Sequence, residues 1–260
     1  MTDTQNEADD RGLAIDRVGI RGLRHPVVVL DPASGASPRH AVATYAMAVD
    51  LPANLKGTHM SRFVEALHEC GGTLDLADPT PLPRRLLEVL PASRAFVSTR
   101  FTYFVEKSAP ATGRRGWLDH EVRLDVEVDR SGQSSVLAVL EIPVATLCPC
   151  SKAISDRGAH NQRGVVSFHV RPCGPLDLAG WISLIEQSAS CELYSLLKRP
   201  DEKLVTERAF DNPVFVEDLV RNAATRAGAR DDIEWFRIEA ENFESIHNHS
   251  AWAVIDRQVR

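Results

Sequence analysis

The feature that most limits what this chain can fold into is a series of segments in which apolar and polar residues alternate. In the clearest segment, HEVRLDVEVD (120–129), the alternating apolar residues are Val122, Leu124, Val126 and Val128. A period of two places these side chains on one face of a β-strand, so that this face is buried and the other is exposed to solvent. Further strands are predicted at 39–52, 93–107, 133–144, 163–172, 231–243 and 247–259.

Segments with helical periodicity occur in pairs between these strands. Predicted helices cover 58–72, 81–90, 176–198 and 212–228. Asp177 is a good N-cap for the third helix. In the fourth helix, Asn212, Pro213 and Gly228 are the residue types that cap, begin and end a helix.

The order of the elements repeats, although the sequence itself does not. Each half reads strand, strand, helix, helix, strand, strand, with a division near residue 130. This order predicts an α+β fold of two tandem units, each an antiparallel β-sheet with a pair of helices on one face. The predicted organisation is a disordered N-terminal tail at 1–14, a first unit at 15–130 and a second unit at 131–260.

Composition narrows the classes of function. The net charge of −6 argues against general binding to nucleic acid or to acidic membranes, which requires a basic face. The longest apolar runs are far shorter than a bilayer span, and the first residues lack the basic start and apolar core of a signal peptide. A cytoplasmic protein is therefore expected, with most of its five cysteines reduced.

The stretch TLCPCSKAISDRGAHNQR (146–163) contains Cys148 and Cys150 around a proline, followed by His160. A cysteine in a soluble protein is most often a small buried apolar residue. Here the surrounding residues are polar, which favours a ligand over a core residue. A thiolate and a neutral imidazole are good ligands for zinc, and a catalytic zinc site needs a third protein ligand and one position for water.

A second cluster lies near the C-terminus and consists of Glu239, Glu241, Glu244, His247 and His249. In a strand, His247 and His249 would share one face. Two interpretations are open from the residues alone. The cluster is either a charged, solvated strand edge or a carboxylate–imidazole group for general acid–base catalysis.

A third group of carboxylates lies around the last predicted helix. Glu202 and Glu207 are predicted in a polar connection between two helices, and Glu217 falls in the first turns of the next helix. The helix dipole keeps a carboxylate ionised at that position, although such a residue is usually only a favourable helix start. The segment KGTHMSRF (56–63) is either a phosphate-binding site at a helix N-terminus or an ordinary helix start capped by Thr58.

Four motifs, in the order in which the family has them, make the chain closely similar to the type IB GTP cyclohydrolase I family. These metal-dependent bacterial enzymes catalyse the first step of folate synthesis. The motifs are LPANLKGTHMSRFVEAL, TLCPCSKAISDRGAHNQRG, ELYSLLKRPDEKLVTERAFDNPVFVEDLVR and FESIHNHSAWA, and the similarity runs from about residue 25 to the end. The resemblance implies the tunnelling fold (T-fold). It also implies a homo-oligomer, a tetramer assembled through strand edges, with sites at subunit interfaces.

The resemblance further implies which residues carry the chemistry. Cys148, His160 and Glu202 match the family's metal-site residues, for zinc or manganese. Glu217 matches the glutamate that anchors the purine ring of the substrate. The implied reaction converts GTP and water to 7,8-dihydroneopterin triphosphate and formate, the first step of tetrahydrofolate biosynthesis. It begins with attack of a metal-activated water on guanine C8.

Residues near the reacting end of the substrate are also implied. Glu244, His247 and Cys150 match such residues, and His249 lies beside them, but their acid and base roles are not divided. The candidates for neutralising the negative charge of the triphosphate are Lys152, Arg157, Arg163, Lys56 and Arg62.

Two alternatives remain at this point. The first is another enzyme of the same fold, such as a pterin enzyme or a nitrile reductase. A nitrile reductase would need a cysteine nucleophile and a nicotinamide cofactor, and the chain has no G-x-G-x-x-G fingerprint. The second is a non-enzymatic metal-binding or redox-sensing protein that uses Cys148-Pro149-Cys150. Such a protein would need neither a purine anchor nor an acid–base cluster.

Overall fold

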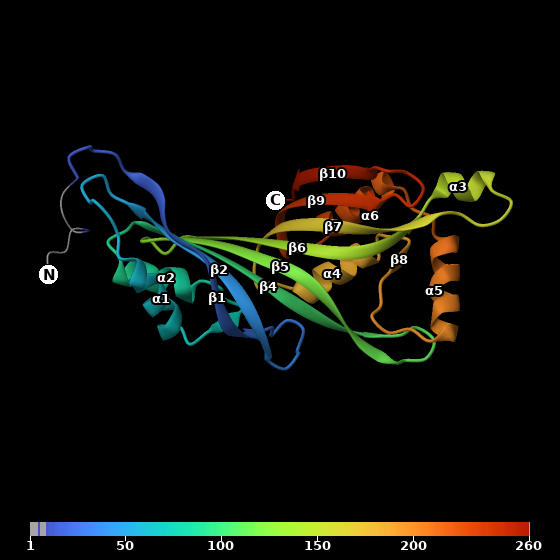
Figure 1. Ribbon diagram of the computed structural model, residues 1–260, viewed down its shortest axis with the longest axis horizontal. Helices are drawn as coiled ribbons and strands as arrows, with labels where there is room; N and C mark the ends of the chain where they lie inside the picture. Colours follow the sequence, from blue (N-terminus) through green and yellow to red (C-terminus); the bar gives the residue numbers. More distant parts are fainter. Residues whose placement is uncertain (1–4, 6–8, 260) are drawn as a thin grey trace. The chain divides into compact units, whose positions relative to one another are not determined.

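The computed structural model describes residue 5 and residues 9–259 (Figure 1). Of the predicted tail at 1–14, residues 1–4 and 6–8 therefore lie outside the described residues. The chain divides into two compact units, which are described in turn. The limits of 15–130 and 131–260 given above for two units stay a prediction. Within the described part, no helix is long and apolar enough to cross a membrane.

Unit 1 comprises, within the described residues, the chain up to Phe101, Arg123–Leu137 and Gly174–Leu176. Its complete elements are β1 (Ile15–Leu30), β2 (Arg39–Leu51), α1 (Met60–Glu69), β3 (Thr73–Asp75) and α2 (Pro81–Val89). It also contains parts of β4 (Arg94–Ser108), β5 (Arg115–Asp129) and β6 (Ser134–Leu147). Strand β2 pairs antiparallel with β1 and with β4, and β3 runs parallel to β1.

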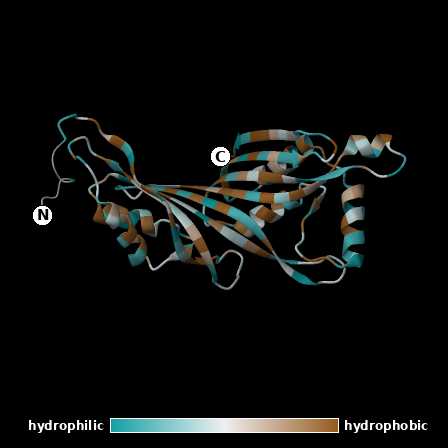
Figure 2. Cartoon of the chain, viewed as in Figure 1, coloured by the Kyte–Doolittle hydropathy of each residue, from teal (hydrophilic) through white to brown (hydrophobic). Residues whose placement is uncertain are grey.

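The core of unit 1 follows the alternation seen in the sequence. Along β2, Tyr45, Met47 and Val49 are buried while the residues between them are half-buried. Helix α1 contributes the fully buried Phe63, and α2 contributes the fully buried Leu86. Figure 2 shows the same alternation of hydropathy along the strands.

Unit 2 comprises Thr102–Val122, Ala138–Cys173 and the chain from Asp177 onward. Its complete elements are α3 (Pro149–Ile154), β7 (Asn161–Pro172), α4 (Leu178–Glu186), β8 (Cys191–Glu192), α5 (Arg199–Asp211), α6 (Val216–Gly228), β9 (Ile233–Phe243) and β10 (Ser250–Gln258). The strand order β10-β9-β7-β6 is antiparallel throughout, and β8 adds to β6.

The core of unit 2 lies between α4, α6 and the sheet. Helix α6 packs on β9 and β10 and contacts α4. The largest buried side chain is Trp181, whose indole N–H donates to Asp232 at 2.9 Å. Phe168 and Phe236 from neighbouring strands pack with their ring centroids 6.4 Å apart. Sheets that are antiparallel except for the short parallel strand β3, with helices packed on them, confirm the predicted α+β class.

The helix predicted over 176–198 is too long, because it ends at Glu186. Asp177 is its N-cap as predicted, and its carboxylate accepts from the Gly180 N–H at 2.9 Å. The chain then leaves the helix because small polar side chains bind the backbone instead. Ser188 donates to the Leu184 carbonyl, and Ser190 accepts from the Leu147 N–H on β6.

The polar connection predicted around Glu202 and Glu207 is also wrong, since both residues lie on α5. Consequently the predicted cap of the next helix is wrong as well. Asn212 ends α5, its side chain donates to the Ala189 carbonyl at 3.0 Å, and α6 begins only at Val216. Strands β1, β3 and β8 were not predicted.

Asp201 fixes the start of α5. The side chain is fully buried and accepts hydrogen bonds from the backbone N–H groups of Lys198, Ala111 and Thr112 and from the Thr112 hydroxyl. Burial alone would raise the pKa of this carboxyl, but the hydrogen bonds lower it to about 2. Asp201 therefore ties α5 to the turn between β4 and β5.

His120 on β5 predicts a pH-dependent loss of stability. The residue is 1% exposed, and burial, reinforced by the charge of Lys107, lowers the pKa of its imidazole from 6.5 to about 4. The unfolded chain therefore binds a proton below pH 6.5 that the folded chain excludes until about pH 4. Lowering the pH from 7 to 5 is expected to reduce the free energy of unfolding by about 2 kcal/mol through this residue.

Denaturant unfolding at both pH values measures this effect. His120→Leu is expected to lose this part of the pH dependence, whereas His40→Leu, at an exposed position, is expected to retain it. Equal pH dependence in wild type and His120→Leu would contradict the assignment.

Candidate functional site

The ends of β6 and β7 bring the predicted thiol and imidazole ligands together. The two strands pair up to Leu147 and Asn161, so the next residues, Cys148 and His160, lie opposite each other. The Cys148 N–H donates to the His160 carbonyl at 3.1 Å. Residues 12 positions apart in the sequence thus become direct neighbours because α3 and its loop connect two paired strands.

Ser151 holds this arrangement in place, a role that no sequence pattern indicated. Cys148 is the N-cap of α3, with Pro149 in the first helical position, and its sulfur accepts from the Ser151 N–H at 3.5 Å. The Ser151 hydroxyl donates to the Cys148 carbonyl at 3.2 Å and accepts from the His160 N–H at 3.1 Å. One hydroxyl therefore links the backbones of both predicted ligands.

Glu244 joins the site from the end of β9. Its carboxylate oxygen Oε2 lies 3.9 Å from Nδ1 of His160, and both side chains are largely buried, at 13% and 14% exposed. Gln162 Nε2 donates to the other oxygen of Glu244 at 3.5 Å. The Ser245 hydroxyl lies 3.4 Å from the same imidazole nitrogen. A carboxylate thus faces an imidazole, which is the pairing that proton transfer near neutral pH requires.

Three further polar side chains share the face of the sheet that carries Cys148 and His160. Thr146 lies opposite Gln162, and Asn242 lies opposite Gly164, two residues further along β7. Among the described residues, no hydrogen-bond partner exists for Thr146 Oγ1, Gln162 Oε1 or Asn242 Oδ1, although all three atoms are buried. Because buried polar atoms are normally paired, these oxygens are available to water or to a bound molecule.

Gly164 is required by the close approach of β9. A Cβ atom at this position would lie 2.5 Å from Asn242 Oδ1 and 2.9 Å from the Glu241 carbonyl oxygen. Any side chain here would displace the strand that supplies Glu244.

Three other predicted residues are near Cys148 or Glu244 in the sequence, but their side chains are exposed to solvent. Cys150 is exposed on α3, and His247 and His249 are exposed in the segment between β9 and β10. The prediction that these histidines lie in a strand is wrong, since β10 begins at Ser250. Their rings nevertheless stack, with centroids 5.1 Å apart and an interplanar angle of 13°.

Glu202 and Glu217 are not brought to Cys148 and His160 by any contact of the described residues. Glu202 is exposed on the first turn of α5 and pairs with Arg199 at 3.4 Å. Glu217 is exposed on the first turn of α6, as predicted. It is the far end of α5 that meets α3, through Lys152, which donates to the Phe210 carbonyl and lies over the Phe210 ring.

The donor set fits a divalent metal ion in part. The thiol of Cys148 and the imidazole of His160 are adjacent and suit a borderline-soft ion. Among the described residues, however, no group of three His, Cys, Asp or Glu side chains is arranged to hold a metal. Glu202 lies eight residues from the contact at Phe210, roughly 12 Å along the helix.

Of the five basic side chains predicted to neutralise a triphosphate, Lys56 is exposed in unit 1 and the other four divide into two groups. Lys152 and Arg62 make structural contacts, since Arg62 donates to the Val89 carbonyl at 2.8 Å in unit 1. Arg157 and Arg163 are exposed in unit 2, in the segment that follows α3 and at the start of β7. These two arginines are the predicted phosphate ligands closest in sequence to His160.

Comparison with known proteins gives a consistent result. A family model described as type I GTP cyclohydrolase folE2 matches residues 1–253. GTP cyclohydrolase FolE2 of Akkermansia muciniphila is 51% identical over 262 residues, covering 100% of this chain and 98% of that protein. GTP cyclohydrolase FolE2 of Cupriavidus necator is 49% identical over 260 residues, covering 100% of this chain and 96% of that protein.

A solved structure resembles the fold. The crystal structure of a highly active mutant of BTUO, a urate oxidase, superimposes with a TM-score of 0.50 at 7% identity, covering 94% of this chain and 100% of that chain. At this identity the likeness concerns the fold alone.

Proposed function

Because this chain belongs to the type I GTP cyclohydrolase FolE2 family, and is thus a GTP cyclohydrolase, we propose that its catalytic centre is built at the ends of β6, β7 and β9. The observation that carries this proposal is the convergence of Cys148, His160 and the carboxylate of Glu244. Family membership also sets aside the non-enzymatic metal-binding alternative. Within the family, the four sequence motifs favour the type IB branch of the tunnelling-fold superfamily.

The proposed reaction converts GTP and water to 7,8-dihydroneopterin triphosphate and formate. Water adds to C8 of the guanine ring while a protonated imidazole donates a proton to a ring nitrogen, and the five-membered ring opens. A second hydrolytic step releases C8 as formate, and the ribose carbons then close the new ring with loss of water. His247 is proposed as the proton donor, since His160 would hold the metal as a neutral imidazole, and Glu244, which faces Nδ1 of His160 at 3.9 Å, would fix the orientation of that ring.

A divalent metal ion, zinc or manganese, is proposed as the cofactor. Cys148 and His160 would hold it, and Glu202 is proposed as the third ligand on the sequence motif alone. Such an ion lowers the pKa of a bound water toward neutrality, which supplies the nucleophile. The thiolate favours zinc, whereas carboxylate and imidazole ligands also accept manganese.

The remaining motif residues are proposed to bind the substrate. Glu217 would anchor the purine by accepting hydrogen bonds from its N–H groups. Cys150 and His247 would lie near the reacting end, with His249 stacked on His247. Because these side chains are exposed in a single chain, their proposed role fits a site completed by another subunit.

Metal removal tests the proposal. Protein that is chelated and reduced is expected to lose release of formate and of the fluorescent pterin from GTP, and zinc or manganese is expected to restore it. Magnesium is the control, because it prefers an all-oxygen octahedral shell and suits a thiolate poorly. Undiminished turnover by metal-free protein would contradict the metal-dependent reaction.

A homotetramer is proposed, with the cytoplasm as its compartment and tetrahydrofolate biosynthesis as its pathway. In unit 2, β10 ends the strand order and pairs only with β9 among the described strands. It carries exposed apolar side chains, with Trp252 57% and Val254 37% exposed. An uncovered strand edge of this kind is suited to pairing with another chain.

Sedimentation equilibrium tests the assembly. The expected mass is four times the chain mass of 28.7 kDa. Val254→Lys is expected to shift the protein toward smaller species, since a charge would then face the partner strand. Arg257→Lys on the same strand is the matched control, and a monomeric wild type would contradict the proposal.

A further inference from the structure

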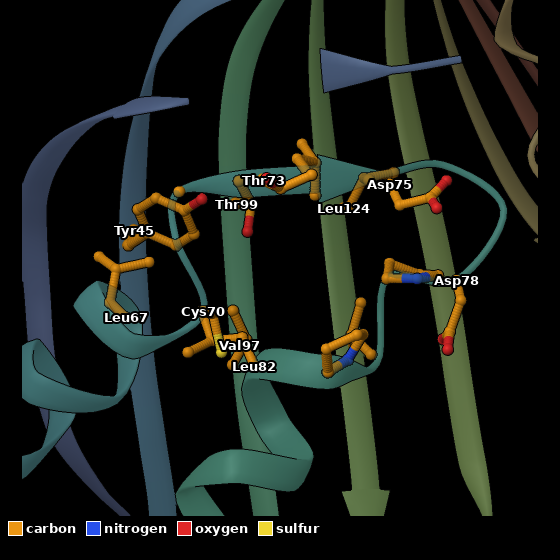
Figure 3. Close-up of a pocket in the computed structure, with 15 residues that line it drawn as sticks. Tyr45, Leu67, Cys70, Thr73, Asp75, Asp78, Leu82, Val97, Thr99 and Leu124 are labelled. Atoms are coloured by element: carbon orange, nitrogen blue, oxygen red, sulfur yellow. The ribbon is translucent and has the colours of Figure 1, made fainter. Parts of the chain in front are cut away.

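Unit 1 contains a cavity of about 160 Å³ that none of the predicted catalytic, metal-binding or substrate-binding residues line (Figure 3). It lies between the sheet and the segments that follow α1 and precede α2. Its lining includes apolar side chains from strands β3, β4 and β5 and from both helices: Leu67, Leu74, Leu82, Val97, Leu124 and Val126. All of its lining residues belong to unit 1, whereas the residues of the proposed catalytic centre belong to unit 2.

Two hydroxyl groups interrupt this apolar wall. Tyr45 on β2 and Thr99 on β4 are direct cross-strand partners, only 3% and 4% exposed, and both line the cavity. Within the described part of the chain, neither hydroxyl makes a hydrogen bond. Because buried hydroxyls are normally paired, this pair is a ready partner for one polar group of a ligand.

The charge state of these groups defines what they can bind. Burial, together with the neighbouring Cys70 thiol, raises the pKa of the Tyr45 phenol to about 12, so the phenol stays neutral and can donate a hydrogen bond. Two carboxylates, Asp75 and Asp78, lie at the other side of the cavity from Tyr45 (Figure 3). They bind nearby backbone N–H groups of Ala77 and Thr80, and their charge disfavours an anionic ligand.

The size of the cavity limits the ligand further. An apolar cavity of about 150 Å³ accommodates one benzene ring, whereas drug-sized ligands need roughly 300 Å³ or more. A guanine nucleotide is therefore too large and too negatively charged for this cavity. The walls suit a single six-membered ring, and the hydroxyl pair suits one polar substituent.

We propose that this cavity binds a small neutral monocyclic aromatic molecule with one hydroxyl or carbonyl group. The ring lies against the apolar walls, and its polar group exchanges hydrogen bonds with the hydroxyls of Tyr45 and Thr99. This site is additional to the GTP site and does not depend on the proposed reaction.

A matched pair of fluorinated probes tests the proposal by ¹⁹F NMR titration of the full chain. 4-Fluorophenol carries the hydroxyl, and fluorobenzene lacks it. A typical buried hydrogen bond stabilises by about 1 kcal/mol, so 4-fluorophenol is expected to bind about 5-fold more tightly than fluorobenzene.

Three variants of lining residues assign the effect to the cavity. Thr99→Val and Tyr45→Phe are each expected to weaken 4-fluorophenol binding about 5-fold while leaving fluorobenzene binding unchanged. Leu82→Trp, which fills the cavity, is expected to abolish binding of both probes. Thr102→Val, outside the cavity on the same strand, is the control and is expected to bind like wild type.

Thermal unfolding of each variant shows whether it is folded, and GTP turnover is expected to stay at the wild-type level in Thr99→Val. Absence of saturable binding by either probe to folded wild type would overturn the proposal. Binding that none of the cavity variants alters would also overturn it, because the probe would then occupy another place.

Discussion

Replacing Cys148 with alanine is expected to lower kcat/KM for GTP by about 10³-fold or more, with little change in stability. The proposed metal would lose its soft ligand, and loss of metal-assisted water activation removes several kcal/mol of transition-state stabilisation. The fold should tolerate the change because Cys148 is only partly buried and its sulfur makes one weak contact, with the Ser151 N–H at 3.5 Å.

Formate release and zinc content measured on the same samples check this expectation. Cys173→Ala is the matched control, since Cys173 is an exposed thiol of the same unit at the end of β7. The control should keep both metal and turnover. Full turnover by Cys148→Ala, with zinc still bound, would remove Cys148 from the proposed centre.

Glu244→Gln is expected to lower kcat by about 10²-fold to 10³-fold, with a smaller change in KM. The substitution keeps the shape of the side chain but removes the negative charge that faces His160 Nδ1 at 3.9 Å. A carboxylate that takes part in proton transfer at the reacting end contributes a factor of about this size to the rate. The pH profile of kcat should also change, because a glutamine side chain cannot accept or donate the proton that a carboxylate can.

Glu241→Gln provides the control for Glu244→Gln. Glu241 is exposed on β9, whereas Glu244 follows the end of that strand and is largely buried beside His160. The control should match wild type in kcat and in its pH profile. Equal effects of the two substitutions would mean that overall charge, and not contact with His160, sets the rate.

The strands of this fold were largely readable from the sequence, except where local composition hides the pattern. β5 alternates cleanly, and its predicted part at 120–129 lies within Arg115–Asp129. β1 was missed because glycines, a proline and arginines break its alternation. Its pairing with β2 shifts register between Arg21 and Leu23, where Gly22 has a φ of 77°. Such a bulge leaves no simple period for a sequence pattern to show.

The helices were predicted with errors in their limits and, for α3 and α5, in their existence. Continuous apolar spacing suggested one helix from 176 to 198, but Ser188 and Ser190 bind backbone groups and end it early. Helix α5 carries too few apolar residues to show a stripe, and only Ala209 and Asp201 are buried on it. Its position depends on Asp201 and the turn between β4 and β5, a long-range contact that no local pattern reports.

The candidate site was also predictable only in part. Cys148 and His160 could be linked from the sequence because they flank one short connection. Glu244 was named from the motif, but its contact with His160 depends on the pairing of β7 with β9. Ser151 and Gln162 gave no signal, since their roles are hydrogen bonds that exist only after the strands have paired.

The division of the chain between the two units also bears on the order of events during synthesis. Unit 2 uses Thr102–Val122, which leave the ribosome long before their partners Glu186 and Asp201, while unit 1 still waits for Gly174–Leu176. Neither unit can therefore be completed from a contiguous stretch of nascent chain. Folding that depends on such distant segments is slow and leaves strand edges exposed in the meantime, where they can pair with another chain.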